Sequence, residues 1–401
     1  MTHSTTEAFS SAAELHLFVI WNNARHCEQK IIADIAANFS VLNIYEIQWQ
    51  KNLFNDNLSR FYGANLPKDC NKEIEIGRDS FLIAVVIDDK PQYSIRQVKA
   101  NKKARVNTNT FEAKTRYREW ASNNDKAGSL VHGSNTSTES NHDLTLLLGI
   151  NAKDFIDKNG GSRWTGEYTK IQQDVAGGSG WKSLEEMFYV LNNTMTYVVL
   201  RNYENMINEL VHYEHPDIDL LVLDRDRTAQ ILNARRVPAE EYRVQYKVTI
   251  SGKEIPCDLR FLGDDYYDKT WQHDILLNRR LDGQGFYVPS ETDHYYSLLY
   301  HAIIHKKIFL DEYRVKLADM ASKLGLESPE RCMLDEYMKN QMYQYVRPKD
   351  MSVRYTIGTS KMPKDRILHR LLKFVWRTAG EPEWCRNWYH NFNRKEREQR
   401  V

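Results

Sequence analysis

The sequence predicts an α+β protein made of two or three domains. The chain has 401 residues, more than one typical domain, and its 41% hydrophobic content is enough to form cores. Residues 14–88 alternate between strand-like and helix-like segments, and residues 196–260 carry strand-like segments around acidic residues. Residues 291–377 are dominated by apolar residues at helical spacing. This order indicates a sandwich of helices on one sheet, then a second α/β core, then a helical block.

Five N-terminal segments predict that sandwich. Leu15–Trp21 is apolar and strand-like, and Ser40–Trp49 returns as a second strand. Glu28–Phe39 repeats its apolar residues at helical spacing, a short helix is expected around Asn57–Tyr62, and Phe81–Asp88 is an apolar strand. The resulting β-α-β-α-β order fits helices packed on one sheet.

Composition narrows the possible partners and compartments. The formal net charge is +1, so a long nucleic acid is unlikely to be the main partner. The five cysteines include no C-x-x-C pair, which argues for a reducing compartment and against a disulfide framework or a zinc knuckle. The N-terminus lacks the basic start of a signal peptide, and no segment approaches the roughly 20 apolar residues of a membrane span. We therefore expect a cytoplasmic protein without membrane contacts.

Glycine-rich and charged runs suggest the segment boundaries. Residues 151–180 include Gly177–Gly180, which lacks the Gly-Lys-Ser/Thr ending of a P-loop and is better explained as a flexible hinge. The basic stretch Arg96–Arg118 fits a solvated loop or a phosphate-facing loop. The predicted segments are a flexible tail (1–13), an N-terminal domain (14–150), a linker (151–180), a second α/β core (181–268), a helical domain (269–392) and a charged tail (393–401).

Two aspartates, Asp217 and Asp219, lie two residues apart in a strand-like segment that follows the strand Tyr197–Leu200. Residues i and i+2 of a strand face the same side, so this spacing sets two carboxylates side by side and turns Ile218 into the core. Such carboxylates repel each other unless a cation lies between them, and hard oxygen ligands suit Mg²⁺. The alternative is that both are ordinary acids at a solvated strand end.

A third aspartate, Asp258, completes the pattern. Lys247–Arg260 has the pattern of a β-hairpin with its turn near Ser251–Lys253, and Asp258 falls on the return strand. An Asp-x-Asp strand and a later strand bearing a third aspartate form the arrangement of a two-metal site for in-line attack on phosphorus.

This segment resembles the nucleotidyltransferases of the polymerase-β-like superfamily over roughly residues 180–265. That family has a helix, a strand, a turn, an Asp-x-Asp strand and a third aspartate on a later strand; the helix here is Ser183–Asn193. The resemblance implies a nucleotidyltransferase α/β core in which Asp217, Asp219 and Asp258 are the catalytic residues and the ligands of Mg²⁺, or alternatively of Mn²⁺.

One turn departs from the family pattern. The Gly-Ser turn that holds the triphosphate in the family appears here as Arg201-Asn202-Tyr203-Glu204. Arg201 and Asn202 are therefore expected to replace that turn in binding the phosphates of the nucleotide.

A second motif lies in the N-terminal domain. His132-Gly133-Ser134-Asn135, followed by Glu139-Ser140 and a helix, resembles the active-site segment of nucleoside diphosphate kinases, which reads His-Gly-Ser-Asp with Glu-Ser following. The resemblance extends over roughly residues 14–149 and implies a ferredoxin-like sandwich. It also implies a histidine nucleophile at His132, whose imidazole can carry a phosphoryl group while Glu139 holds the other ring nitrogen.

The same resemblance assigns further residues to nucleotide or phosphate binding. These residues are Tyr62, Thr108, Arg118, Asn135 and Glu139, with Arg96 or Arg105 as the source of a second guanidinium.

Two features depart from the kinase pattern. The family's lysine after the first strand is replaced by Trp21-Asn22-Asn23, and one extra residue separates His132 from Glu139. The alternatives are that His132 binds a nucleotide without reacting, or that it caps the following helix.

The helical block carries one more candidate. His301 and His305 lie four residues apart in the predicted helix Glu291–Ile308, the spacing of a helical metal pair, although no third ligand lies nearby in the sequence. Packed histidines are one alternative, and contact of His305, Lys306 or Lys307 with a triphosphate is another.

Both halves thus predict the handling of nucleoside triphosphates. The leading hypothesis is a Mg²⁺-dependent nucleotidyltransferase with a small molecule or sugar phosphate as acceptor. The alternatives are a phosphotransferase that uses His132, or a nucleotide-sensing scaffold without turnover. Nucleoside diphosphate kinase folds often oligomerise, so a homo-oligomer is a further expectation.

Overall fold

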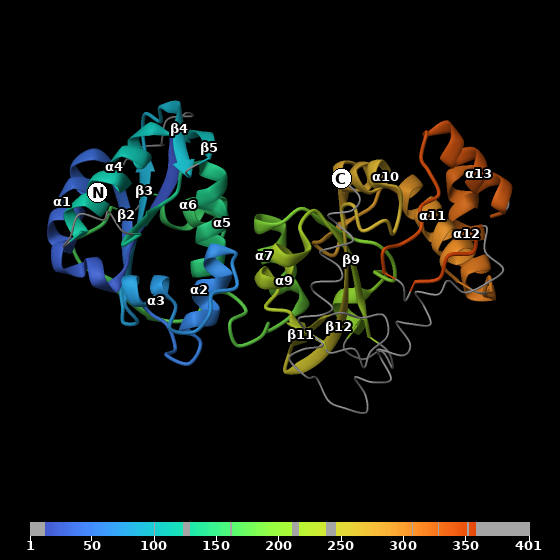
Figure 1. Cartoon of the computed structure of the whole chain (residues 1–401), viewed down its shortest axis with the longest axis horizontal. Helices are drawn as coiled ribbons and strands as arrows, with labels where there is room; N and C mark the ends of the chain where they lie inside the picture. The colour runs from blue at the N-terminus through green and yellow to red at the C-terminus, as the bar shows by residue number, and fades with distance from the viewer. Residues whose placement is uncertain are drawn as a thin grey trace, which may run out of the picture. The chain divides into compact units, whose positions relative to one another are not determined.

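The computed structural model describes residues 13–99, 101–122, 129–160, 163–210, 216–237, 246–306, 308–327, 329–350 and 353–357. These residues form a mixture of helices and strands (Figure 1). The chain divides into two compact units, Met1–Thr194 with Gln230–Asn233, and Met195–Ala229 with Ala234–Val401. The helix expected at the start of the second core therefore groups with the first unit. The predicted tail at 393–401, and all but the last residue of the tail at 1–13, lie outside the described residues.

The sheet of the first unit has the strand order β6-β1-β3-β2-β7. Its strands are β1 (Glu14–Ile20), β2 (Ser40–Gln48), β3 (Phe81–Asp88), β6 (Val131–Gly133) and β7 (Thr169–Gln172). The pairs β1–β3, β1–β6 and β2–β3 are antiparallel, and only β7 joins in parallel, beside β2. Every residue of β3 is buried, as expected for a central strand whose residues are almost all apolar.

Helices and one hairpin complete the first unit. They are η1 (Asn22–Cys27), α1 (Glu28–Asn38), α2 (Phe54–Tyr62), α3 (Asn71–Ile76), the hairpin of β4 (Tyr93–Lys99) and β5 (Lys102–Asn107), α4 (Thr108–Ala121), α5 (Ser137–Leu148), α6 (Ala152–Asn159) and α7 (Leu184–Thr194). Figure 1 shows α1 and α4 on one side of the sheet and α5 and α6 on the other. The five elements predicted between Leu15 and Asp88 are confirmed.

Helix α4 positions the site of this unit. It begins where the Asn107 side chain accepts a hydrogen bond from the Thr110 amide, a typical N-cap. Ala113, Tyr117 and Ala121 follow at helical spacing and join the core with residues of α1 and the sheet. The loop predicted for Arg96–Arg118, whether solvated or facing a phosphate, is therefore wrong, since this stretch forms a β-hairpin and a helix.

The linker predicted at 151–180 is also wrong. It contains α6 and β7, and β7 pairs with β2 from Tyr45 to Gln48. Gly177 has a positive φ of 69°, and a Cβ there would come within 2.5 Å of the Trp181 ring. This glycine is needed for a packed turn, so it does not mark a free hinge.

The sheet of the second unit has the order β10-β11-β12-β9-β8. Its strands are β8 (Tyr197–Val199), β9 (Ile218–Val222), β10 (Arg235–Arg236), β11 (Tyr246–Ile250) and β12 (Lys253–Phe261). The pair β9–β12 is parallel, and the other neighbours are antiparallel. The predicted hairpin is confirmed, because β11 and β12 pair around Ser251 and Gly252, whose φ angles of 50° and 76° fit a tight turn.

Helices and a small hairpin surround this sheet. They are α8 (Met206–Glu209), α9 (Arg225–Ile231), α10 (Lys269–Leu277), the pair β13 (Arg280–Leu281) and β14 (Tyr287–Val288), α11 (Glu291–Tyr300), the π-helical turn η3 (His301–His305), α12 (Asp311–Leu324) and α13 (Arg331–Asn340). An aromatic core joins α10, α11 and α13 through residues such as Trp271, Tyr300 and Tyr296, which stacks on Tyr337 with ring centroids 3.7 Å apart. This core fixes the helix that carries His301 and His305.

Candidate functional site

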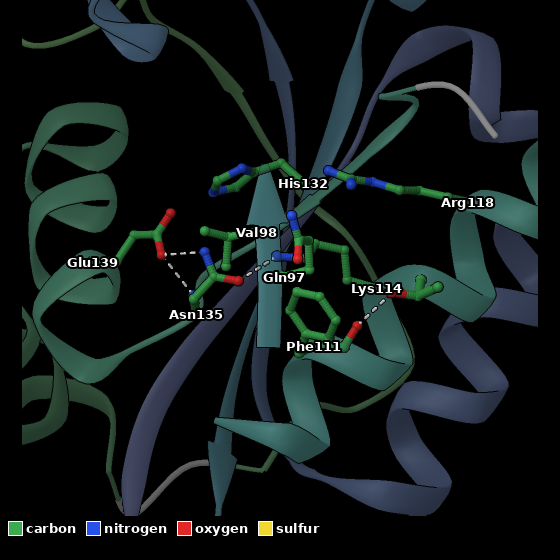
Figure 2. A pocket seen from close by; sticks show the side chains of 9 residues that line it. Gln97, Val98, Phe111, Lys114, Arg118, His132, Asn135 and Glu139 are labelled. Atoms are coloured by element: carbon green, nitrogen blue, oxygen red, sulfur yellow. Dashed lines mark hydrogen bonds between the residues drawn. The ribbon is translucent and has the colours of Figure 1, made fainter. Parts of the chain in front are cut away.

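Each unit contains one pocket that collects residues expected at a site. The pocket of the first unit has a volume of about 230 Å³ (Figure 2). Its lining residues are Gln97, Val98, Phe111, Lys114, Thr115, Arg118, His132, Asn135 and Glu139.

His132 is held in place by a buried carboxylate. It lies on β6 opposite Val19 of β1, and its Nε2 is 2.7 Å from Oδ2 of Asp143 on α5. Burial disfavours the Asp143 carboxylate, but the charges of His132 and His142 and their hydrogen bonds outweigh burial and lower the pKa of Asp143 to about 2. A carboxylate at Nε2 fixes the ring orientation and leaves Nδ1 as the nitrogen available for chemistry.

Glu139 does not have the role predicted for it. Its Oε2 accepts hydrogen bonds of 2.7 Å from both the backbone and the side-chain nitrogen of Asn135. Asp143, one helical turn further along α5, contacts the imidazole instead. Glu139 and Asp143 are four residues apart and therefore lie on the same face of α5. Asp143 is the one of the two whose carboxylate hydrogen-bonds to His132.

Two cations on α4 reach the same pocket, as Figure 2 shows. Lys114 Nζ donates to the Gly133 carbonyl at 2.9 Å and to Asn135 Oδ1 at 2.6 Å, and Arg118 Nε donates to the Val131 carbonyl at 2.6 Å. Burial and the charge of Arg118 lower the pKa of Lys114 to about 8, and burial lowers the pKa of Arg118 as well. Buried cations that hydrogen-bond to neutral oxygens favour binding of an anion.

A third cation lies close to this group. Lys72 sits over the Tyr62 ring, with Nζ 4.8 Å from its centroid, and donates to the Ser129 carbonyl at 3.4 Å. Burial, with a contribution from Arg118, lowers the pKa of Lys72 to about 8. The sequence analysis missed Lys72, Lys114 and Asp143. Lys114 and Arg118 lie four residues apart, so a prediction of helix α4 would have indicated that both cations lie on the same face of it.

The remaining kinase-like candidates lie elsewhere in the first unit. Tyr62 accepts a hydrogen bond from Trp21 Nε1, and its ring centroid lies 6.4 Å from that of His132. Arg96 pairs with Glu112, Arg105 stacks over Tyr93, and the Thr108 hydroxyl bonds to Ser94. The structure thus brings together His132, Arg118, Asn135 and Glu139, but Tyr62, Arg96, Arg105 and Thr108 do not line the pocket.

The second unit has a pocket of about 240 Å³ around the three aspartates. Its lining residues are Arg201, Asn202, Asp217, Asp219, Asp258, Arg260, Tyr266, His301, His305, Lys306, Tyr313, Val353 and Arg354. All the residues predicted for the nucleotidyltransferase site are therefore in one place. Asp219 and Asp258 are direct partners across the parallel strands β9 and β12, Asp217 immediately precedes β9, and Ile218 is fully buried as expected.

Two arginines already pair with two of these aspartates. Arg201 Nη2 lies 2.7 Å from Asp219 Oδ1, and Arg260 contacts Asp258 Oδ2 through Nη2 at 2.7 Å and Nε at 3.0 Å. Arg260 also contacts Asp350 at 2.9 Å. Arg260 was not predicted as a site residue, although its position two residues after Asp258 on a strand places it on the same face.

The arginines do not fully offset the buried negative charge. Burial and the neighbouring Asp219 raise the pKa of Asp217 to about 6, although Arg201 and Lys306 oppose the rise. Burial also raises the pKa of Asp258 to about 6, with Asp219 adding to it and Arg260 opposing it. Carboxyl groups that resist ionisation in this way favour the arrival of another cation.

The fit of Mg²⁺ to the aspartates depends on the arginines. The donor set is correct for a hard cation, because it consists of carboxylate oxygens from two adjacent strands. Among the described residues, however, only His132, Glu139 and Asp143 have acid or histidine ligand atoms that all lie within 4.8 Å of one another. A metal on the three aspartates would compete with Arg201 for Asp219 and with Arg260 for Asp258.

Comparison with known proteins found no family model that matches this chain and no curated protein similar to it. Among the described residues, no helix has both the length and the apolar character needed to span a bilayer.

Proposed function

We propose that this protein is a Mg²⁺-dependent nucleotidyltransferase whose active site is the aspartate pocket of the second unit. One observation carries the proposal: Asp219 and Asp258 are paired across adjacent parallel strands, with Asp217 beside them, in a pocket that also holds cationic side chains. The resemblance of this segment to polymerase-β-like nucleotidyltransferases supports the same reading. We propose the corresponding transferase fold for this unit.

Asp217 and Asp219, with Asp258, would hold the metal. When bound, Mg²⁺ supplies charge neutralisation and orientation of the triphosphate. Arg201, once released from Asp219, and Arg354 offer guanidinium groups to the phosphates of the nucleotide. The pocket thus carries both kinds of group that a triphosphate with its metal requires.

We assign to Asp258 the role of accepting the proton of the acceptor. A carboxylate in the pocket can take the proton of an approaching hydroxyl group. The acceptor oxygen attacks the α-phosphorus of the nucleotide, the bond from that phosphorus to the bridging oxygen breaks, and pyrophosphate leaves. The acceptor is proposed to be a small molecule or a sugar phosphate.

The experiment that tests this function measures pyrophosphate release from each of the four nucleoside triphosphates in the presence of small-molecule acceptors. Asp219→Asn should abolish the release, and because it leaves the buried Arg201 guanidinium without its carboxylate, it should also lower the thermal unfolding temperature. Asp217→Asn should abolish the release without lowering that temperature. Asp226→Asn removes a largely exposed acid of the same unit, 76% exposed in its side chain, and should have no effect. Full activity of Asp219→Asn would exclude this site.

A second candidate function is phosphoryl transfer at His132. The 2.7 Å contact from Nε2 to Asp143 favours it, because this contact leaves Nδ1 as the reactive nitrogen of a histidine that lines the cationic pocket. The antiparallel order β6-β1-β3-β2 also supports the ferredoxin-like sandwich that the kinase resemblance implies. Lys114 would supply the ammonium that Trp21-Asn22-Asn23 lacks. Nδ1 would attack the γ-phosphorus of a nucleoside triphosphate, and the diphosphate would leave.

Incubation with γ-labelled ATP tests the second function. Acid-labile label on the protein should disappear in His132→Asn and remain in His26→Asn, which alters an exposed histidine of the same unit. Label that persists in His132→Asn would exclude a phosphohistidine at this position.

A further inference from the structure

His305 is a buried polar side chain of the aspartate pocket with no partner for its ring. It is 3% exposed and lines the pocket from the last residue of the π-helical turn η3. Among the described residues, neither Nδ1 nor Nε2 has a partner at good hydrogen-bond geometry, and the Tyr266 backbone is near enough only to favour protonation of the ring weakly. His301, also in this turn, differs because its Nδ1 lies 2.7 Å from the Tyr266 hydroxyl. A buried donor and acceptor without partners destabilise a fold, so their presence at a pocket wall points to a ligand.

Aromatic rings pack around the imidazole of His305 but do not hydrogen-bond to its nitrogens. The ring centroids of Tyr266, Tyr300 and Tyr267 lie 4.3, 5.0 and 6.0 Å from that of His305. Contacts of this kind restrict rotation and exclude water, but they offer the ring nitrogens no hydrogen bond. Single π-helical turns often occur at functional sites. The position of the imidazole is therefore fixed before any ligand arrives.

The charge state of His305 differs from that of most polar groups around it. Burial, with the positive charges of Arg260, Arg201 and Lys306, lowers the pKa of His305 well below its usual value, and the Tyr266 backbone opposes this only in part. The ring is therefore neutral near pH 7 and presents one donor and one acceptor. The arginines, Lys306 and the aspartates are suited to phosphates and metal ions instead.

We propose that His305 hydrogen-bonds a hydroxyl group of the substrate in this pocket. A hydroxyl matches a neutral imidazole because each offers one donor and accepts one hydrogen bond. That hydroxyl belongs either to the ribose of the nucleotide or to the acceptor, and the experiment below separates these two sources. The inference rests on the proposed nucleotidyltransferase function, and it assigns His305 as a specificity-determining residue of that site.

His305→Met separates a binding role from a packing role. Methionine has a similar volume and removes both unpaired nitrogens, so the variant should unfold at the same temperature as the wild type or at a higher one. A histidine that served packing alone would lower the unfolding temperature when replaced. The matched control is His294→Gln, which alters a buried histidine of α11 whose Nδ1 bonds to Tyr203 and which does not line the pocket.

Calorimetry on the full chain provides the test. The probes are ATP, 2′-deoxyATP and 3′-deoxyATP with Mg²⁺, and glucose 1-phosphate. If the ribose is recognised, the wild type should bind ATP about tenfold more tightly than one deoxy analogue, and His305→Met should remove that difference. If the acceptor is recognised, the deoxy analogues should bind like ATP, and His305→Met should weaken glucose 1-phosphate binding about tenfold. Equal affinities of the wild type and His305→Met for all four probes would overturn the inference.

Nitrogen-15 NMR of histidine-labelled protein gives a second readout that needs no variant except for assignment. The His305 ring signals, identified by their loss in His305→Gln, should not titrate between pH 5.5 and 8 and should shift when the recognised probe binds. Signals that titrate normally, or that stay fixed while a probe saturates the pocket, would also overturn the inference. If pyrophosphate release depends on Asp219 but not on His305, the inference about His305 is wrong and the proposed function stands. If binding depends on His305 but no pyrophosphate is released, the proposed function is wrong and the role of His305 in binding stands.

Discussion

The two pockets arrange their charged side chains in opposite ways. In the first unit, the buried Lys114 and the half-buried Arg118 hydrogen-bond to carbonyl and amide oxygens, so their charges remain available to an anion. In the second unit, Arg201 and Arg260 are already paired with Asp219 and Asp258. A ligand that carries only phosphate therefore suits the first pocket as it stands. On the proposed function, the second pocket would receive a metal ion together with phosphates, which would take the places of Arg201 and Asp219 as each other's partners.

The largest expected effect tests how the first pocket prepares its histidine. Asp143→Asn should slow labelling of His132 by γ-labelled ATP about 10³-fold, because an amide can favour the wrong imidazole tautomer and cannot stabilise positive charge on the ring. Glu139→Gln should have a much smaller effect, since Glu139 contacts Asn135 and not His132. Rates from rapid quench would measure both. Equal losses in the two variants would contradict the assignment of Asp143.

The next effect tests the internal pairing of the second pocket. Arg201→Gln should increase the affinity of the nucleotide-free protein for Mn²⁺ about tenfold, because it frees the Asp219 carboxylate. Electron paramagnetic resonance of free Mn²⁺ would measure the affinity. In the wild type, adding a nucleotide should increase Mn²⁺ affinity, and this coupling should shrink in Arg201→Gln. An unchanged Mn²⁺ affinity in Arg201→Gln would show that the Arg201–Asp219 pair does not oppose metal binding, and would contradict the difference between the two pockets.

A smaller effect concerns pH in the first pocket. Because the pKa of Lys114 is lowered to about 8, the ammonium is charged below that pH and is lost above it. Affinity for inorganic tripolyphosphate should therefore fall as the pH rises from 7 to 9. Lys114→Met should weaken binding about tenfold at pH 7 and reduce this pH dependence. Lys72, whose pKa is also lowered to about 8, accounts for the part that remains. If the wild type binds tripolyphosphate with the same affinity from pH 7 to 9, the prediction is wrong.

The smallest effect is on stability in the second unit. The folded state raises the pKa of Asp217 to about 6, so between about pH 4 and 6 the folded chain binds more protons than the unfolded chain. The contribution of Asp217 to stability therefore declines as pH rises to about 6 and is then constant. Asp217→Asn should be more stable than the wild type at pH 7.5, by about 1 kcal/mol after allowance for partial exposure, and equally stable near pH 4. Urea denaturation at both pH values would measure this, with Asp226→Asn as the control.

The sequence predicted those parts of the fold that local patterns specify. The apolar strands between Leu15 and Asp88 and the Ser251–Gly252 turn are examples, because short apolar runs and turn residues act over few positions. Helix α4 was missed because its lysines and arginines mask a short apolar stripe of Ala113, Tyr117 and Ala121. The segment 151–180 was interpreted as a linker because its glycines suggest mobility, whereas the structure packs Gly177 against Trp181.

The candidate sites were predictable only in part. The Asp219–Asp258 neighbourhood followed from a strand and a hairpin, both visible in the sequence. The partners of those aspartates could not be predicted from the sequence, because Arg201 and Asp219 come into contact only through tertiary packing. The same holds for His305, whose spacing from His301 suggested a metal pair but whose unpaired ring depends on three tyrosines distributed over Tyr266–Tyr300. Lys307, weighed together with His305, lies outside the described residues.

The measurement that tests the central claim most directly is phosphorus NMR of the reaction products. The protein is incubated with Mg²⁺ and each nucleoside triphosphate in turn, with and without a small-metabolite extract. We expect pyrophosphate together with an α-phosphorus in a new diester or diphosphate, both absent with Asp219→Asn. Nucleoside diphosphate with a transferred γ-phosphoryl group, unaffected by Asp219→Asn, would contradict the claim and move the chemistry to His132. Binding of nucleotide without any product would identify a nucleotide-sensing scaffold instead.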